Sequence, residues 1–383
     1  MDSNKYVDYW MGHWSLILGH SPKNVRTNVR MQLDNGWIHG TVSKNSIDLS
    51  EKISKAVPVA EKIRYASTGT EATMYAVRLA RTITKRKTIA KIDGGWHGYT
   101  TDLLKTINWP FHKSESSGLT DEKHIISLPY NNLEKSVKIL KTKKNDLAAI
   151  IIEPVLGGGG CIPATREYLL GIQEFCHKNN ILFILDEIVT GFRFRFGCLY
   201  NTMKLDPDLV TLGKIVGGGF PIGVICGKNE LMKYASTSIF SKTDRAYIGG
   251  GTFSANPLTM MAGSTMLTTI KNKGNLLYKK LNSFGIETRK MLDKKFGGSV
   301  ITTGIGSLFL THFLSDSTYE INNATDAAKC NIKKLHDYHF HMIANDGIFF
   351  LQGKLGAFSD VHTKSDIANL AKSTDEFLTK FKK

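Results

Sequence analysis

The hydrophobic and polar positions along the middle of the chain follow two alternating spacings. In some segments apolar residues recur every three or four positions, as on one face of a helix. Other segments are short runs of aliphatic and β-branched residues with little polar alternation, which is typical of strands covered on both faces. Helical spacing occupies 47–57, 71–85, 133–140 and 168–179, and strand-like runs occupy 88–92, 124–128, 148–153, 181–186 and 209–212. This alternation predicts an α/β fold with a mostly parallel sheet wrapped by helices, and a ligand site at the carboxyl ends of the strands.

The pattern changes after about residue 257. A long helical stretch at 258–281 is followed by a glycine-rich strand region at 300–313, a helix near 327–339, an apolar segment at 347–351 and an amphipathic helix at 365–381. No Pro- or Ser-rich linker separates the two regions, so we expect a fixed cleft between packed units. We predict an N-terminal segment at 1–45, a large domain at 46–265 and a smaller α+β C-terminal domain at 266–383.

Composition narrows the class of protein. With 383 residues, and at about 150 residues per domain, the chain is long enough for two or three packed units. Its 42% of hydrophobic and 22% of charged residues exclude global disorder. The net charge of +16 favours anionic partners: nucleic acid, acidic membrane, or phosphorylated and carboxylated small molecules. Because the lysines are scattered singly, we favour an ordinary basic surface with no nucleic-acid groove.

The cysteines and the N-terminus indicate the compartment. The five cysteines form no CxxC pair and have no ligand spacing with histidine, which favours reduced thiols and no metal site. The first residues lack the basic start and apolar stretch of a signal peptide, and no apolar run reaches the roughly 20 residues of a membrane helix. We therefore expect a soluble, cytoplasmic protein without membrane contact.

Three polar features lie at the ends of predicted strands, and each has alternative interpretations. The small residues at 67–71 suit phosphate binding by backbone amides, or an ordinary helix cap in which Thr70 caps and Glu71 complements the dipole. Asp186 ends an apolar strand, where a carboxylate needs donors, a cation or a metal ion. Lys214 enters a glycine-rich turn, either as a surface lysine or as a residue that binds phosphate or forms a Schiff base.

Together, the three features match the needs of pyridoxal 5'-phosphate (PLP): a lysine for the Schiff base, an aspartate for the pyridine nitrogen and a turn for the phosphate. The match extends over six ordered segments, STGTEATMYAVRLAR, GWHGY, IIEPV, ILDEIVTGFR, PDLVTLGKIVGGGFPIG and GGTFSANPL. These segments resemble the class III PLP-dependent aminotransferases, most closely the glutamate-1-semialdehyde 2,1-aminomutase branch. The resemblance runs from Tyr9 to the final helix. It implies the fold of type I PLP-dependent transferases, with a mostly parallel large domain and a smaller C-terminal domain.

The resemblance implies roles for individual residues. Lys214 corresponds to the Schiff-base lysine, which also moves a proton, and Asp186 corresponds to the partner of the pyridine nitrogen. The other cofactor contacts that it implies are Ile188 on a ring face, Trp96 stacked on the ring with His97 beside it, and Gly69 and Thr70 at the phosphate. Thr252 corresponds to a threonine that reaches the phosphate of the neighbouring subunit, which implies a homodimer with shared active sites. We expect Arg193 to pair with Glu187 in a structural role.

Four departures from the aminomutase pattern lie on the substrate side. The chain begins almost at the DYW segment, so we expect it to lack the N-terminal arm whose arginine binds the substrate carboxylate in the aminomutase. The segment Gly12-His13-Trp14 replaces Ser-Trp-Gly, Gly158 stands where an asparagine lies near the cofactor hydroxyl, and Lys354 replaces a glutamate. We predict that Lys354, with His13 and Trp14, contacts the substrate carboxylate. The alternative for Lys354 is a solvated loop lysine.

These departures favour an enzyme that transfers amino groups between two molecules. We predict a class III PLP-dependent aminotransferase that moves an amino group from an amino acid or amine donor to a carbonyl acceptor, acting on small carboxylated or amine substrates. The alternative is glutamate-1-semialdehyde 2,1-aminomutase, an isomerase that moves the amino group within one molecule to give 5-aminolevulinate. Other PLP chemistry, such as decarboxylation or racemisation, and a non-catalytic protein that binds through its basic surface are further alternatives.

Overall fold

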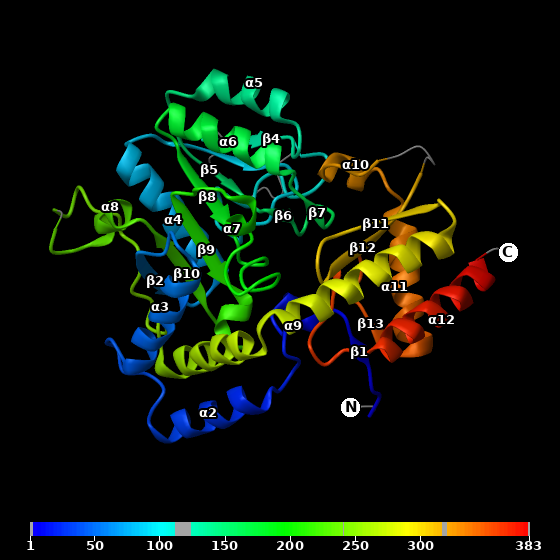
Figure 1. Ribbon diagram of the computed structural model, residues 1–383. Helices are drawn as coiled ribbons and strands as arrows, with labels where there is room; N and C mark the ends of the chain where they lie inside the picture. The colour runs from blue at the N-terminus through cyan, green and yellow to red at the C-terminus, as the bar shows by residue number, and fades with distance from the viewer. Residues whose placement is uncertain (1–2, 112–123, 240, 316–319, 382–383) are drawn as a thin grey trace.

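A seven-stranded sheet forms the centre of the larger body of the molecule (Figure 1). The computed structural model describes residues 3–111, 124–239, 241–315 and 320–381. Across the sheet the strand order is β2 (Lys62–Ala66), β10 (Gly223–Gly227), β9 (Leu209–Gly213), β8 (Leu182–Asp186), β5 (Leu147–Ile152), β3 (Thr88–Ile92) and β4 (Ile125–Leu128). β10 is antiparallel to both of its neighbours, and the remaining pairs are parallel. The predicted mostly parallel α/β fold is confirmed.

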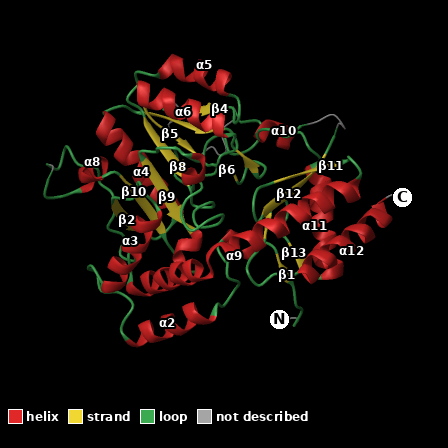
Figure 2. Ribbon diagram, in the orientation of Figure 1, coloured by secondary structure: helices red, strands yellow, loops and turns green. Residues whose placement is uncertain are grey.

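The two faces of this sheet are covered by different helices (Figure 2). In β8, Leu182 and Ile184 pack in the same layer as the apolar side of α4 (Gly69–Thr84). Phe183 and Leu185 point to the opposite layer, which they share with α6 (Arg166–Lys178). α5 (Leu133–Lys143) packs against α6. A strand that is apolar on both faces is therefore buried over its whole length, and only its end is available to a ligand.

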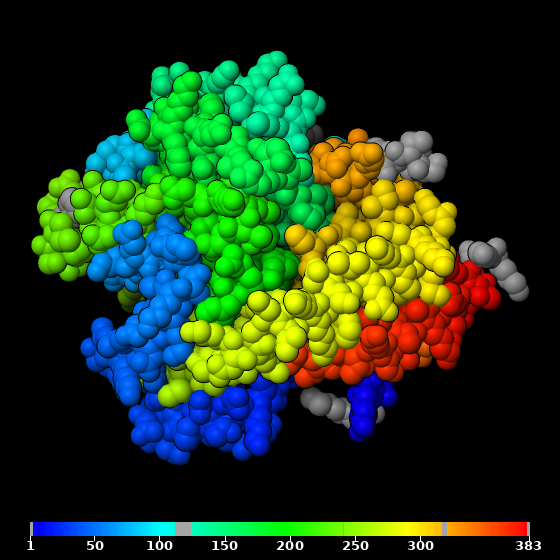
Figure 3. Space-filling view, in the orientation of Figure 1, coloured from blue at the N-terminus to red at the C-terminus, as the bar shows by residue number. Residues whose placement is uncertain are grey.

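The C-terminal body is a three-stranded antiparallel sheet of β11 (Val300–Thr303), β12 (Leu308–Phe313) and β14 (Gly356–Ala357), packed against α11 (Ile332–Asp346) and α12 (Lys364–Phe381). The 40-residue helix α9 (Pro257–Phe296) runs from the larger body to this one and is broken at Gly274, where the backbone is not helical. Its first half contacts α2 (Lys23–Asp34) and α3 (Lys44–Ala56). Its second half lies beside α12 (Figure 3).

The first residues of the chain lie against the C-terminal body. β1 (Val7–Asp8) pairs in parallel with β13 (Ile348–Phe349). Tyr9 continues this pairing, because its N–H donates to the Phe349 carbonyl (2.9 Å) and its carbonyl accepts from the Ala357 N–H (2.8 Å). The division at 1–45, 46–265 and 266–383 stays a prediction. The structure adds that residues 7–9, in the predicted N-terminal segment, pack against the predicted C-terminal domain.

The predicted elements differ from the observed ones mainly at breaks. The helix predicted near 327–339 is two helices, α10 (Ala324–Ala328) and α11, because the Asn331 side chain accepts from the Lys334 N–H (2.9 Å) and starts a new helix. The remaining short elements are α1 (Met11–Trp14), α7 (Tyr200–Met203), α8 (Asn229–Met232), the hairpin β6 (Val155–Leu156) and β7 (Ile162–Pro163), and the 3-10 turns η1 (Lys214–Gly217) and η2 (Lys233–Ala235). Among the described residues, no helix is both long and apolar enough to span a bilayer.

Candidate active site

A cavity of about 380 Å³ lies where the carboxyl ends of the central strands face the C-terminal body. Its base is formed by residues that follow β5, β8 and β9, together with the N-terminus of α4. Its opposite side is formed by the N-terminal segment and the loop that follows β13. The cavity therefore joins the sheet edge on which a ligand is expected to segments from both ends of the chain.

Asp186 is the last residue of β8 and is 3% exposed. Its Oδ1 accepts hydrogen bonds from the Ile188 N–H (3.1 Å) and the Thr211 hydroxyl (3.0 Å). Its Oδ2 lies 2.7 Å from His97 Nδ1. These donors offset the cost of burying the carboxylate and hold it in one orientation at the base of the cavity.

His97 is buried beside Asp186. Burial lowers the pKa of His97, although the hydrogen bond to Asp186 opposes the shift, so the neutral ring donates through Nδ1. Its Nε2 is then an acceptor, and this buried atom has no hydrogen-bond partner among the residues that the structure describes. The resemblance suggested a place beside the stacked tryptophan. The geometry adds that His97 orients Asp186.

Lys214 follows the last residue of β9 and has a left-handed backbone (φ 48°), which is uncommon for a residue other than glycine. Burial lowers the pKa of Lys214, while the carboxylates of Asp186 and Glu153 act in the opposite direction. Its Nζ lies 5.8 Å from the centre of the Trp14 ring. The lysine therefore enters the cavity between the carboxylates at its base and the aromatic residues on its opposite side.

Glu153 is a cavity residue that the sequence interpretation did not single out. It follows β5 directly and is 4% exposed. Its carboxylate accepts from the N–H groups of Trp96 (2.9 Å) and Gly157 (3.2 Å), and burial, followed by the charge of Asp186, raises its pKa to about 8. The same pattern that pointed to Asp186, an apolar strand ending in an acid, could have identified Glu153.

The N-terminus of α4 forms one corner of the cavity, at Gly69 and Thr70. The cap is Thr68, whose hydroxyl accepts from the Glu71 N–H (3.1 Å), so the expectation that Thr70 is the capping residue is wrong. A Cβ on Gly98 would lie 2.5 Å from Thr70 Oγ1. The close approach of these small residues leaves backbone amides and the positive helix end available to an anion.

Apolar side chains line the base of the cavity, among them Ile188, Val189, Ile222 and Trp96. Trp96 is 37% exposed, and its loop is fixed by the buried Lys91, whose Nζ donates to the carbonyl oxygens of Gly95 and Lys105. A Cβ on Gly158 would lie 3.4 Å from the Trp96 Cβ. The aminomutase asparagine at this position would therefore contact Trp96.

Thr252 lies apart from these residues in the single chain. It is exposed and lines a separate groove with Gly249–251 and Tyr65. The structure therefore brings together Lys214, Asp186, Ile188, Trp96, His97, Gly69 and Thr70 in one cavity, but not Thr252.

His13, Trp14 and Lys354 lie on the opposite side of the cavity, near Trp10 and Leu351. The Trp14 Nε1–H donates to the Leu355 carbonyl (2.9 Å), which ties the N-terminal segment to the Lys354 loop. Burial lowers the pKa of His13, and the charge of Lys214 adds to this shift. Among the described residues no arginine lines the cavity, and Lys354 is the lysine on this side.

The Lys354 loop is held from behind by His339 of α11. The Gly353 N–H donates to His339 Nδ1 (3.2 Å). The His339 ring stacks on Phe350 (4.8 Å between centres), which stacks in turn on Tyr9 (5.1 Å). Burial lowers the pKa of His339 to about 3, so the ring is a neutral acceptor at ordinary pH.

Arg193 and Glu187 do not form the expected pair. The Arg193 Nε–H donates to the Val189 carbonyl (2.9 Å), and Nη2 donates to the Trp14 carbonyl. Glu187 accepts instead from the Thr190 hydroxyl and from the N–H groups of Leu199 and Tyr200, each at 2.8 Å. The expectation is wrong because both buried side chains find nearby backbone partners, and Arg193 thereby fixes Trp14 at the cavity.

These observations describe the site of a PLP-dependent enzyme. A lysine, an oriented aspartate and a glycine-lined helix N-terminus meet in one cavity, and a buried acceptor, His97 Nε2, lies beside the aspartate. The residues present therefore fit the cofactor. The family model for class III aminotransferases matches residues 1–305, and the chain belongs to this family, whose cofactor is PLP.

Relatives and solved structures agree with this assignment. Glutamate-1-semialdehyde 2,1-aminomutase of Methanosarcina acetivorans is 35% identical over 381 residues, covering 96% of this chain and 86% of the relative. The protein of the same name from Methanosphaera stadtmanae is 33% identical, covering 100% and 89%. An omega-transaminase from Sphaerobacter thermophilus has a similar structure, with a TM-score of 0.88 at 25% identity, covering 99% of this chain and 88% of that one.

Proposed function

We propose that this protein is a PLP-dependent glutamate-1-semialdehyde 2,1-aminomutase. The observation that supports this proposal is the shared function of the two archaeal relatives, whose similarity extends over nearly the whole chain. The sequence alone favoured amino transfer between two molecules. The relatives favour transfer within one molecule, from glutamate-1-semialdehyde to 5-aminolevulinate.

Five residues would hold the cofactor. PLP supplies a carbonyl that condenses with an amine and a ring that delocalises the charge left when a C–H bond breaks. Asp186, oriented by His97, would face the pyridine nitrogen. Ile188 and Trp96 would contact the ring, and the amides at Thr70 would bind the phosphate.

Lys214 would move the proton. Because burial lowers the pKa of its amine, more of it is neutral near pH 7 than for a surface lysine, and a neutral amine accepts a proton from a substrate carbon. The charge of Asp186 stabilises the ammonium form that follows. The same group would then return the proton to the carbon on the other side of the transferred nitrogen, a step that amino transfer within one molecule and between two molecules both require.

The charge on the substrate side suits a monocarboxylate. Glutamate-1-semialdehyde has one carboxylate, at the end remote from its amino and aldehyde carbons. We propose that Lys354 binds this carboxylate and that His13 and Trp14 border it, since all three line the cavity opposite its base. A substrate with a second carboxylate next to the reacting carbon would find no arginine among the cavity residues that the structure describes.

Two incubations with the purified holoenzyme test the reaction. In the first, glutamate-1-semialdehyde is supplied alone and 5-aminolevulinate is measured. In the second, amino donors are supplied with 2-oxo acids. Formation of 5-aminolevulinate without an added donor supports the aminomutase. Turnover in the second incubation alone would instead assign a transaminase, and turnover in neither would overturn both.

Replacement of Lys214 tests its role. We expect Lys214→Ala to fold and to bind PLP without a covalent link, and to lose turnover by at least about 10³-fold, because both the covalent attachment and the proton transfer depend on one amine. Borohydride treatment followed by mass analysis of the chain measures the link. Lys228→Ala, which removes a surface lysine paired with Asp206, is the matched control and should keep both properties.

Intermolecular transamination is the second candidate. Gly158 and Lys354 depart from the aminomutase pattern, and both line the cavity. The structural similarity to an omega-transaminase points in the same direction. In this case Lys354 would bind the carboxylate of a donor whose amino group, or of an acceptor whose carbonyl group, is remote from that carboxylate.

We further propose a cytoplasmic homodimer. The exposed position of Thr252, in a groove beside the glycine run Gly249–251, supports a contact made with the cofactor of a partner chain. All five cysteines are unpaired, as expected in a reducing compartment. Sedimentation of wild type and Thr252→Ala, with cofactor retention measured in each, tests the shared site: Thr252→Ala should stay a dimer and lose phosphate affinity.

A further inference from the structure

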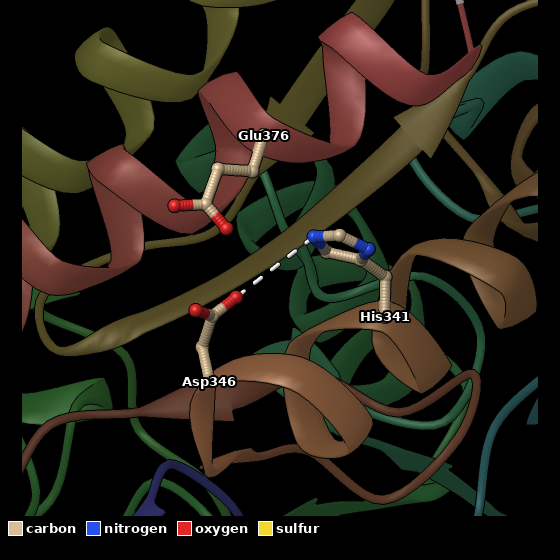
Figure 4. Close-up of side chains that lie close together, drawn as sticks. All are labelled: His341, Asp346 and Glu376. Atoms are coloured by element: carbon tan, nitrogen blue, oxygen red, sulfur yellow. Dashed lines mark ion pairs between the residues drawn. The ribbon is translucent and has the colours of Figure 1, made fainter.

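Three possible metal ligands meet in the C-terminal body, outside the cavity (Figure 4). His341 and Asp346 belong to the last turns of α11, and Glu376 belongs to α12. Their ligand atoms all lie within 4.8 Å of one another. We infer that this cluster binds a divalent cation of the Zn²⁺ type, which joins α11 to α12.

His341 provides the first reason. Its side chain is 5% exposed, and its Nε2 is buried without a hydrogen-bond partner among the described residues. The facing oxygen is Asp346 Oδ2 at 3.8 Å, which is too far for a hydrogen bond. Leaving a ring nitrogen buried and unpaired costs free energy. A metal ion between His341 Nε2 and Asp346 Oδ2 would bond to both atoms and remove this cost.

The size of the gap provides the second reason. Two ligand atoms that each lie about 2.1 Å from a tetrahedral Zn²⁺ are about 3.4 Å apart. His341 Nε2 and Asp346 Oδ2 therefore need to approach by only a few tenths of an ångström. The Glu376 side chain, 39% exposed, points toward the same gap (Figure 4). Water would complete the coordination, as it does in open zinc sites.

The charges around Asp346 also favour a cation. Asp346 is the last residue of α11, where the helix end is negative and a carboxylate is unfavourable without a compensating charge. The Ser373 hydroxyl donates to the Asp346 carboxylate, as hydrogen-bonding groups around metal ligands commonly do.

Binding requires three neighbouring side chains to adjust. Lys372, whose Nζ lies 3.6 Å from Glu376, and Lys380 are both exposed and would turn toward solvent. The Asn345 amide, 3.0 Å from His341 Nδ1, would present its oxygen to the proton that the metal-bound ring keeps on Nδ1. Because these side chains must move, we expect an affinity weaker than that of a preformed structural zinc site.

Equilibrium dialysis of the untagged holoenzyme against micromolar ZnCl₂, with metal analysis, tests the inference. We expect about one more Zn²⁺ per chain in wild type than in His341→Ala or Glu376→Gln. Because His341 is buried and its loss can affect folding, Glu376→Gln, on a partly exposed residue, is the decisive variant. Asp375→Asn is the matched control: it removes the same charge one position away, from a carboxylate that pairs with Lys295.

Thermal unfolding gives a second measurement that does not depend on activity. ZnCl₂ should raise the melting temperature of wild type and Asp375→Asn, and should leave Glu376→Gln unchanged, because a ligand that binds only the folded state stabilises it. Equal zinc content in wild type and Glu376→Gln, or an equal thermal response in both, would overturn the proposed site.

Discussion

Glu153 and Asp186 end two neighbouring buried strands, β5 and β8, and face the same lysine. Asp186 is tied to a hydroxyl and a histidine, whereas Glu153 accepts from two backbone amides and from no side chain among the described residues. Burial raises the pKa of Glu153 to about 8. At neutral pH, Glu153 is therefore largely a neutral acid in the cofactor-free chain.

This raised pKa predicts how stability depends on pH. Between pH 4.5 and about 8 the folded state keeps a proton on Glu153 that the unfolded state releases, so Glu153 lowers the free energy of unfolding as the pH rises through this interval, by at most about 1.4 kcal/mol per unit. Glu153→Gln cannot release a proton, so its free energy of unfolding should rise relative to that of wild type as the pH rises through the interval.

Urea unfolding of the cofactor-free chain at several pH values measures this difference. Glu134→Gln, which changes an exposed glutamate on α5, should follow the wild-type curve. A constant difference between Glu153→Gln and wild type from pH 5 to 8.5 would show that burial does not shift the carboxyl group as described.

At the scale of elements, the apolar runs predicted the central strands well, and β3 has the predicted bounds. A strand that is buried on both faces appears in the sequence as a continuous apolar run, which a single sequence is enough to reveal. β10 and α2 were not predicted, because β10 is short and bounded by glycines and α2 is mostly polar. The break of α9 at Gly274 was not visible either, since polar residues surround it and continue the helical pattern.

The same limits apply to the candidate site. Lys214 and Asp186 could be located from the sequence because each lies where an apolar, strand-like run ends. The contacts of Arg193 with backbone carbonyls could not be predicted. Every residue has a backbone carbonyl, so the sequence does not indicate which one a side chain will bind. His339 was missed for a related reason: it acts on a loop 14 residues away through one N–H group.

The contact between α4 and the Trp96 loop gives a prediction at this scale. Gly98 has φ +92°, and a Cβ there would lie 2.5 Å from Thr70 Oγ1 and 2.7 Å from its Cα. We expect Gly98→Ala to destabilise the protein by about 1–3 kcal/mol beyond the cost of the left-handed backbone, and to weaken PLP binding.

Gly298→Ala is the matched control, because Gly298 has φ +85° with open space around its Cβ position. Denaturant unfolding and cofactor titration of both variants measure the two effects. If Gly98→Ala and Gly298→Ala lose equal stability and keep equal PLP affinity, the contact with Thr70 is not what requires glycine.

At the scale of the whole molecule, the stack of His339, Phe350 and Tyr9 joins α11, the loop after β13 and the N-terminal segment behind the substrate side of the cavity. We expect His339→Phe, which can keep the stack but removes the acceptor for the Gly353 N–H, to raise KM about 5- to 20-fold with little change in kcat, because one loop hydrogen bond is worth about 1–2 kcal/mol.

His339→Asn offers an acceptor again and should recover part of the affinity. Lys354→Met removes the charge itself and should raise KM at least as much as His339→Phe. Steady-state kinetics of the three variants, with PLP absorbance as a check on the cofactor, compare them. A fall in kcat without a rise in KM in His339→Phe would contradict a role in placing the loop.

The pairing of β1 with β13 sets an order of events during synthesis. Residues 7–14 leave the ribosome first, but their partners at 348–357 are among the last to be made. All strands of the seven-stranded sheet and the described residues at the base of the cavity lie before residue 228. They can therefore fold before β13, the partner of β1, has been synthesised. We therefore expect the part proposed to hold the cofactor to fold before the part proposed to contact the substrate, and a nascent chain stopped short of residue 348 to have the first without the second.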